Sequence, residues 1–228
     1  IKNYNFYFLP IISHCPIQIR DFEKKIISKC NIVNVDTDEY ILMDIPYVQN
    51  KPFFEILIDT SEGKKQTLLR FTSSYKYLLN ALLLLLEHNI VHYDLKGENI
   101  LFNMDIMEPQ IIDFGISIPM NNVNDENLKN YFYVFAPEYY LWPLEIHIIN
   151  YLIHYAENDL NKENAESISE LYTSNNKGLV IFSPDFIEQY KQACLKECMK
   201  YVGKPKKEVI NELLKYYKTW DNYSLSIL

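Results

Sequence analysis

Glycine is scarce in this sequence: the 228 residues include five, at positions 63, 97, 115, 178 and 203. A loop that cradles phosphate groups with its backbone needs several glycines close together. No two of the five lie close enough to form such a loop, and the chain has no Ala-x-Lys sequence. The sequence therefore excludes a glycine-rich nucleotide loop within these residues.

Positive charge is also in short supply. The chain has 22 lysines and arginines against 30 aspartates and glutamates, which gives a net charge of −8. Proteins that bind nucleic acids need a basic face. We therefore expect no nucleic-acid partner, and the surplus of acid favours substrates of basic character.

Long hydrophobic runs are absent. The longest apolar run covers residues 78–86, which is far shorter than the roughly 20 residues of a membrane-spanning helix. We expect a buried helix there and no membrane span. The chain starts at Ile1, and no basic segment followed by an apolar stretch and a cleavage site marks a signal peptide. These features predict an intracellular, cytoplasmic protein.

Cysteine is limited to positions 15, 30, 194 and 198. This pattern fits neither a dense disulfide framework nor a paired Cys-x-x-Cys zinc site. Cys194 and Cys198 fall on an apolar helical stripe, so we expect buried, reduced thiols rather than metal ligands.

Tyrosine, asparagine, isoleucine and lysine are abundant, and the chain has 19 tyrosines. Such a composition indicates an AT-rich coding genome, as in a protist or a large DNA virus. A viral protein would reside in the host cytoplasm or in the virion.

Two polar segments carry the side chains that phosphoryl transfer requires. The reaction needs a carboxylate that accepts the hydroxyl proton, a positive charge near the transferred group and oxygen ligands for magnesium. Asp94 is the candidate base and Lys96 the candidate cation. Asn99 and Asp113, the latter 19 positions after Asp94, are the candidate magnesium ligands. Either segment alone recurs by chance, but their order and spacing together predict a phosphoryl-transfer site.

The stretch between these segments predicts a β-hairpin. Residues 100–102 and 110–112 have the character of short strands, and residues 104–109 form the turn between them. Such a hairpin brings Asn99 and Asp113 to the same end, so the two candidate ligands meet.

These residues resemble a known family. The chain is similar to eukaryotic-type protein kinase domains in a catalytic loop, a magnesium-binding segment and the end of an activation segment: His92-Tyr93-Asp94-Leu95-Lys96-Gly97-Glu98-Asn99, Asp113-Phe114-Gly115 and Ala136-Pro137-Glu138. Lysine at position 96 resembles the serine/threonine branch. The resemblance implies an α+β, bilobal fold, with an incomplete small lobe of strands and a mainly helical large lobe.

The resemblance also implies an activity and its cofactors. ATP and Mg2+ would serve transfer to serine or threonine hydroxyls of protein substrates. Asp94 and Lys96 would be the catalytic residues, and Asn99 and Asp113 the metal ligands. Lys96, Asn99 and Asp113 would also contact the nucleotide.

The resemblance further implies an adenine site. Residues 40–45 form a strand similar to the one that enters the hinge between the lobes. Met43 would be the gatekeeper of the adenine pocket, Asp44 the first hinge residue and Leu101 the pocket floor. Pro46 departs from the family pattern, because it lacks the N–H that would bind the adenine ring.

Two interpretations of the residues before the hinge stay open. In one, residues 21–29 form the small-lobe helix, Glu23 pairs with a phosphate-binding lysine, and residues 31–35 form the next strand. In the other, residues 6–12 form that strand, within an aromatic and aliphatic run, and residues 13–38 form a long hairpin loop.

The large-lobe residues follow the family order, with departures. Residues 66–88 show a helical pattern that is apolar nearly all round, which predicts a helix buried in the lobe. Tyr93 stands where many kinases have an arginine that pairs with a phosphorylated activation segment. Tyr131 stands where serine/threonine kinases often place a threonine that touches the catalytic aspartate and lysine.

The end of the chain completes the expected organisation. Residues 221–228 resemble the start of the central large-lobe helix, where Asp221 would steady the backbone of the catalytic loop. The expected units are a partial small lobe and hinge, a catalytic core with the activation segment, a helical insertion, and the start of the central helix: 1–46, 47–138, 139–220 and 221–228. On this basis the chain is truncated, and the fragment alone is expected to be inactive.

The insertion at residues 139–220 is expected to be helical and to offer a surface for a protein partner. Its helices are predicted to begin at Pro143, Pro184 and Pro205, because proline favours the first turn of a helix.

Two other classes of function fit parts of the sequence. A pseudokinase that recruits a partner through the insertion is favoured by Pro46, Tyr93 and the missing glycine-rich loop. The intact Asp94 and Lys96 count against it. A small-molecule kinase of the aminoglycoside type shares the spacing from Asp94 to Asn99 but generally lacks the lysine pattern.

Overall fold

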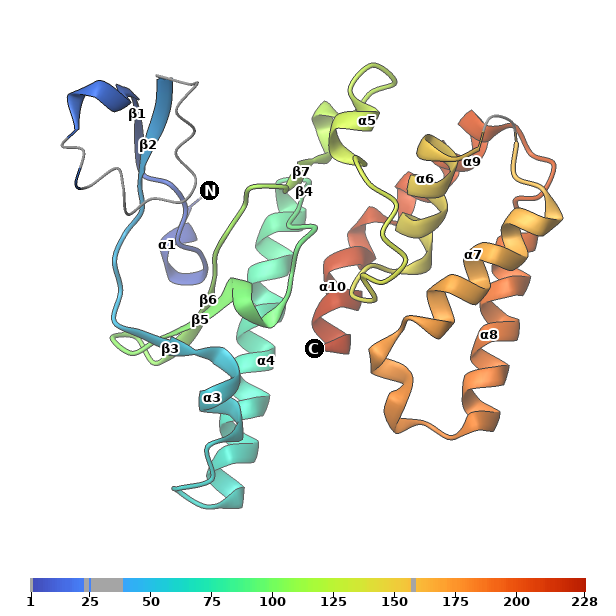
Figure 1. The fold of residues 1–228 in the computed structure, drawn as a ribbon. Helices are drawn as coiled ribbons and strands as arrows, with labels where there is room; N and C mark the ends of the chain where they lie inside the picture. Colours follow the sequence, from blue (N-terminus) through green and yellow to red (C-terminus); the bar gives the residue numbers. More distant parts are fainter. Residues whose placement is uncertain (1, 23–24, 26–38, 157–158) are drawn as a thin grey trace.

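The computed structural model describes residues 2–22, 25, 39–156 and 159–228. Strands lie mostly in the first half of the chain, and helices fill the second half. Figure 1 shows the β1–β2 hairpin at one end of the molecule and helices α7 and α8 at the other, with α4 and α10 between them. The chain therefore has the α+β composition that the sequence predicts.

The first strand lies later than predicted. Residues Tyr4–Tyr7 form a short helix, α1, and Phe8 makes a single parallel bridge to Ile111. The prediction of a strand at residues 6–12 is therefore wrong. Residues 4–7 instead close a helical turn, in which the N–H of Phe8 donates to the carbonyl of Tyr4 at 2.9 Å.

The β1–β2 hairpin replaces that expected strand. Strand β1 (Ser13–Gln18) pairs antiparallel with β2 (Glu39–Asp44). The strand predicted at residues 40–45 is confirmed, one residue earlier. Of the alternative helix at 21–29 only residues 21, 22 and 25 are described. Glu23 and the alternative strand at 31–35 lie outside the described residues.

A three-stranded sheet carries the predicted hairpin. Strands β5 (Ile100–Asn103) and β6 (Glu108–Ile111) pair antiparallel, and β3 (Asn50–Pro52) adds to β5. The backbone N–H of Ile112 donates to the carbonyl of Asn99 at 2.9 Å. The hairpin is thus confirmed, and the residues on either side of it meet at one end.

Helix α4 (Lys64–Glu87) crosses the middle of the molecule, as residues 66–88 predict, after the short helix α3 (Phe53–Ile58). One face of α4 packs inward through Ser74, Leu78, Ala81, Leu82 and Leu85. The prediction that this helix is buried on all sides is wrong, because Leu68, Leu69 and Leu83 are between 54% and 66% exposed.

The second half of the chain packs as helices. These are α5 (Leu128–Tyr131), α6 (Leu144–His154), α7 (Lys162–Ser174), α8 (Pro184–Met199), α9 (Lys206–Leu213) and α10 (Tyr217–Ile227). The predicted starts at Pro143, Pro184 and Pro205 are confirmed to within a residue. Helix α7 was not predicted, although Asn161 and Asn164 cap it reciprocally.

Short elements connect these parts. Strands β4 (Ile90–Val91) and β7 (Ile118–Pro119) pair antiparallel beside the end of α4. Single 3-10 turns occur at Ile19–Asp21, Gly97–Asn99, Met120–Asn122, Lys177–Ile181 and Leu214–Tyr216.

Helix α10 contacts both hydrophobic clusters of the described residues. Trp220 is buried in a large cluster built from α6 to α10, which also contains Val91 and Tyr93. Leu225, on the same helix, is buried in a second cluster formed by α3, α4 and the three-stranded sheet. The last helix therefore joins the two halves of the molecule.

The thiols of Cys194 and Cys198 are buried in α8, as predicted. Burial raises the pKa of Cys194 to about 11 and that of Cys198 to about 12, so both stay protonated and unreactive at neutral pH. Within the described ranges, no three His, Cys, Asp or Glu side chains are grouped as a metal site would need. In the same ranges no helix combines the length and the apolar character of a membrane span.

His147 is a buried titratable side chain beside the larger cluster. It is 1% exposed on α6, and its ring packs near the rings of Phe135, Trp142 and Tyr172. Burial lowers the pKa of His147 to about 4, because the charged imidazolium loses its hydration in this environment.

This burial predicts a pH-dependent stability. Between about pH 6.5 and pH 4 the unfolded state binds a proton at residue 147 and the folded state does not, so stability falls as the pH falls through that window. His147→Phe should abolish this contribution, on the order of 3 kcal/mol across the window, in urea unfolding followed at several pH values. His14→Gln, at an exposed position, should retain the wild-type slope. An unchanged slope in His147→Phe would contradict the assignment.

Candidate active site

The backbone of the loop 92–99 is held by a carboxylate from the far end of the chain. Asp221, on α10, accepts hydrogen bonds from the N–H of His92 at 2.6 Å and the N–H of Tyr93 at 3.0 Å. Burial raises the pKa of Asp221, although both N–H donors favour its charged form. This is the contact that the resemblance implies for Asp221.

The ring of His92 ties this loop to the segment that precedes Asp113. Its Nε2 lies 2.9 Å from the carbonyl oxygen of Ile112, and its ring packs edge-on against Phe114 at 4.9 Å. The hydroxyl of Ser117 donates to the carbonyl of His92 at 3.1 Å. The two predicted segments are therefore joined on both sides of Asp113.

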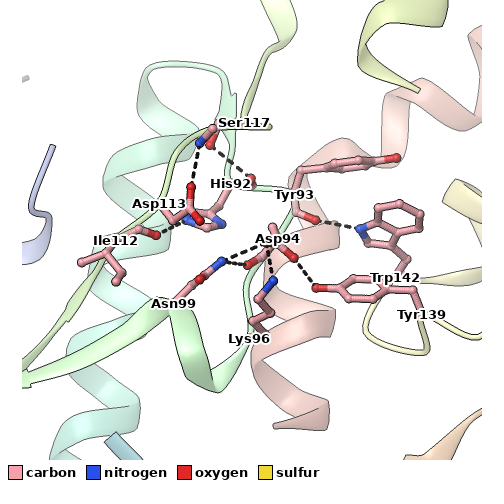
Figure 2. A network of polar contacts seen from close by, with 11 residues as sticks. His92, Tyr93, Asp94, Lys96, Asn99, Ile112, Asp113, Ser117, Tyr139 and Trp142 are labelled. Atoms are coloured by element: carbon pink, nitrogen blue, oxygen red, sulfur yellow. Dashed lines mark hydrogen bonds and ion pairs between the residues drawn. The ribbon is translucent and has the colours of Figure 1, made fainter. Parts of the chain in front are cut away.

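The carboxylate of Asp94 is the centre of a hydrogen-bond network (Figure 2). Its Oδ2 accepts from Lys96 Nζ at 2.7 Å and from Asn99 Nδ2 at 2.9 Å. Its Oδ1 accepts from the hydroxyl of Tyr139 at 2.5 Å. The side chain of Asp94 is 15% exposed and that of Lys96 33% exposed. The network is therefore partly buried but remains accessible to solvent.

Asp113 follows the hairpin at its open end, next to Asn99. Its backbone adopts the left-handed conformation with φ 61°, and its Oδ1 accepts from the N–H of Gly115 at 3.2 Å. Figure 2 shows Asp113 on the Asn99 side of the loop and Tyr139 on the opposite side of Asp94. The candidate metal ligands and the Tyr139 hydroxyl thus approach the loop from different sides.

The predicted adenine contacts lie on two separate sheets. Met43 and Asp44 belong to the β1–β2 hairpin, where Met43 is 54% exposed and Asp44 accepts from the hydroxyl of Ser13 at 3.4 Å. Leu101 lies in β5 and is partly buried, opposite Pro52 and Gln110.

Tyr139 was not singled out by the sequence analysis, which noted Tyr131 at the position where serine/threonine kinases often place a threonine near the catalytic aspartate. In the structure Tyr131 ends α5 and packs against the larger hydrophobic cluster, and the hydroxyl on Asp94 belongs to Tyr139. A signal was present, since Tyr139 directly follows the Ala-Pro-Glu at the expected end of the activation segment.

Tyr93 stands at the position where the resemblance implies an arginine. Its ring lies 4.7 Å from that of Trp142 and 5.8 Å from that of Phe132, and its hydroxyl accepts from Asn150 at 3.3 Å. The residue is 2% exposed, and burial raises its pKa. A neutral, buried phenol offers no charge to a phosphate on the segment after Asp113.

The Asp221 contacts predict a large effect on stability. Asp221→Ala should lower the free energy of unfolding by about 2 to 4 kcal/mol, since it leaves two buried N–H groups without an acceptor. Asp221→Asn keeps one acceptor oxygen and should cost less. Chemical unfolding measures both, with the exposed Asn222→Ala on the same helix as the control. An Asp221→Ala protein as stable as the wild type would show that these contacts do not hold the loop.

Comparison with known proteins identifies the family. The model of the protein kinase domain family matches residues 18–142, which is more than half of the chain, so the protein belongs to the protein kinase family. The expected kinase-like α+β fold is confirmed. Members of this family in general transfer phosphoryl groups to proteins and use ATP and a divalent metal.

A solved structure with a similar chain is the "Twitchin kinase region from C.elegans (Fn31-NL-kin-CRD-Ig26)". The identity is 17% and the TM-score 0.39, over 96% of this chain and 34% of that chain. This chain thus spans about a third of the length of that one. No curated protein matches the chain.

Proposed function

We propose that the protein transfers the γ-phosphoryl group of ATP to serine or threonine hydroxyls of protein substrates. The observation that carries this proposal is the set of contacts around Asp94, whose carboxylate binds Lys96 and Asn99 through the same oxygen. A carboxylate held between a cation and an amide is oriented for proton transfer.

Asp94 would orient the acceptor hydroxyl and take its proton as the oxygen attacks the γ-phosphorus, while the bond from that phosphorus to the bridging oxygen breaks and ADP leaves. Lys96 would keep its contact with Asp94 and direct its other N–H groups to the transferred group, where its charge offsets the negative charge of the transition state. Its side chain is partly exposed, so these N–H groups are accessible to a ligand. The two side chains would therefore act together within one loop.

The residues beside this loop suit a magnesium ion. Because Asn99 turns its amide nitrogen toward Asp94, its amide oxygen faces away from that carboxylate. Asp113, next to it at the end of the hairpin, adds carboxylate oxygens, and both are the hard oxygen donors that Mg2+ prefers. Bound there, the metal would neutralise charge on the nucleotide phosphates. Met43, Asp44 and Leu101 are proposed to contact the adenine.

The division into a partial small lobe and hinge (1–46), catalytic core (47–138), helical insertion (139–220) and start of the central helix (221–228) remains our proposal. Helix α10 begins at Tyr217, so the last boundary falls within one helix. Helices α6 to α9 share a hydrophobic cluster with Val91 and Tyr93, which supports a proposal that the insertion is part of the large lobe.

A pseudokinase that recruits a protein partner is the second candidate. The observation in its favour is an apolar surface at the connection between α7 and α8. Val180 and Ile181 are 81% and 82% exposed there, and Phe182 and Phe186 stack beside them. Exposed apolar groups of this kind suit a protein contact. The two candidates are separated by nucleotide binding that depends on magnesium, measured as a thermal shift. The enzyme requires such binding, whereas a scaffold that only recruits a partner does not.

The catalytic role of Asp94 predicts a large loss of activity. In the full-length protein, Asp94→Ala should reduce turnover of ATP on a generic protein substrate by about 100-fold or more, which is the usual contribution of a general base. Asp105→Ala, at an exposed turn of the β5–β6 hairpin, is the matched control and should keep wild-type turnover. Unchanged turnover in Asp94→Ala would refute the mechanism.

The buried Tyr93 predicts activity that does not depend on phosphorylation of the segment after Asp113. Without an arginine at this position, a phosphate on the segment would gain no partner here. Phosphatase treatment of the purified full-length protein should therefore leave turnover unchanged, with loss of phosphate verified by mass spectrometry. Loss of turnover after this treatment would contradict the prediction.

A further inference from the structure

The hydroxyl of Tyr139 lies where a protein substrate would have to bind. It is 2.5 Å from Asp94 Oδ1, and a general base accepts a proton from a hydroxyl within about 2.6 to 3.2 Å. Tyr139 therefore makes the contact that an acceptor hydroxyl needs in the reaction proposed above.

The other oxygen of the carboxylate offers no replacement. Asp94 Oδ2 already accepts from Lys96 and Asn99, and a carboxylate has about four acceptor positions in total. With Tyr139 bound, three of these positions are filled from within the chain. An incoming hydroxyl would find one position left, beside a bulky aromatic ring.

Tyr139 is held in place by its surroundings. Its ring packs edge-on against Trp142 at 4.9 Å, and the indole N–H of Trp142 donates to the carbonyl of Tyr93 at 2.7 Å. Burial, followed by the hydrogen bond to Asp94, raises the pKa of Tyr139. The phenol stays protonated at neutral pH and remains a donor to the carboxylate.

We propose that Tyr139 competes with the protein substrate for Asp94, so that the acceptor hydroxyl must displace the phenol before transfer. This inference rests on the proposed function, because it treats Asp94 as the base. Tyr139 lies in the irregular segment between α5 and α6, so rotation of its side chain would open the position without breaking a helix or strand. The candidate metal ligands Asn99 and Asp113, on the other side of Asp94 (Figure 2), would be unaffected.

The test compares Tyr139→Phe with wild type in the full-length protein. Phenylalanine keeps the ring on Trp142 and removes the hydroxyl. The probe is a serine peptide flanked by arginines, with its dissociation constant measured in the presence of Mg2+ and a non-hydrolysable ATP analogue, and kcat/KM measured with ATP. Tyr140→Phe removes a hydroxyl from the neighbouring residue and is the matched control.

Tyr139→Phe should bind the peptide about tenfold more tightly and raise kcat/KM by about the same factor, because a hydrogen bond to a charged group no longer competes. Its affinity for the nucleotide should equal that of the wild type. Tyr140→Phe should match the wild type in all three measurements, and equal unfolding midpoints would verify that the variants fold.

Two results would overturn the inference alone. One is turnover that depends on Asp94 but is unchanged or slower in Tyr139→Phe, since Tyr139 would then position Asp94 instead of competing for it. The other is phosphate found on Tyr139 after incubation with ATP, which would make it an acceptor. Absence of Asp94-dependent turnover in both proteins would overturn the proposed function together with this inference.

Discussion

One buried carboxylate determines the geometry on which the candidate site depends. Asp221 and His92 are 129 residues apart in the sequence, yet the carboxylate accepts from the backbone of His92 and of Tyr93. Such a contact fixes the path of the loop just before Asp94. Because α10 also packs into both hydrophobic clusters through Trp220 and Leu225, the position of the loop is coupled to the packing of the whole molecule.

Aromatic packing continues this constraint on the other side of the loop. Tyr93 points away from Asp94 into the helical half, where Trp142 and Phe132 surround it. The indole N–H of Trp142 binds the carbonyl of Tyr93, and the same indole packs against Tyr139. The aromatic cluster of Tyr93, Phe132 and Trp142 therefore puts a buried, uncharged side chain at position 93. The same Trp142 packs against Tyr139, whose hydroxyl binds the candidate base.

Local signals predicted local structure well. The β5–β6 hairpin followed from its turn, the starts of α6, α8 and α9 from their prolines, and the buried thiols of α8 from their spacing. Contacts set by tertiary packing were less accessible. Leucines occur on every face of α4, so the sequence does not show which face is buried. The packing of the fold leaves Leu68 and Leu83 exposed. Likewise, the contact between Tyr139 and Asp94 spans 45 residues, and no local pattern in the sequence shows that the two side chains meet.

The central claim is that Asn99 and Asp113 hold one metal ion beside Asp94. The most direct test is a double-mutant cycle on Mn2+ affinity, followed by electron paramagnetic resonance in the full-length protein with a non-hydrolysable ATP analogue. We predict that Asn99→Ala and Asp113→Asn each weaken the same ion, and that the double variant loses less than the sum of the two, as expected for ligands of a shared site. Strictly additive losses, or two ions that each respond to one variant, would contradict the account.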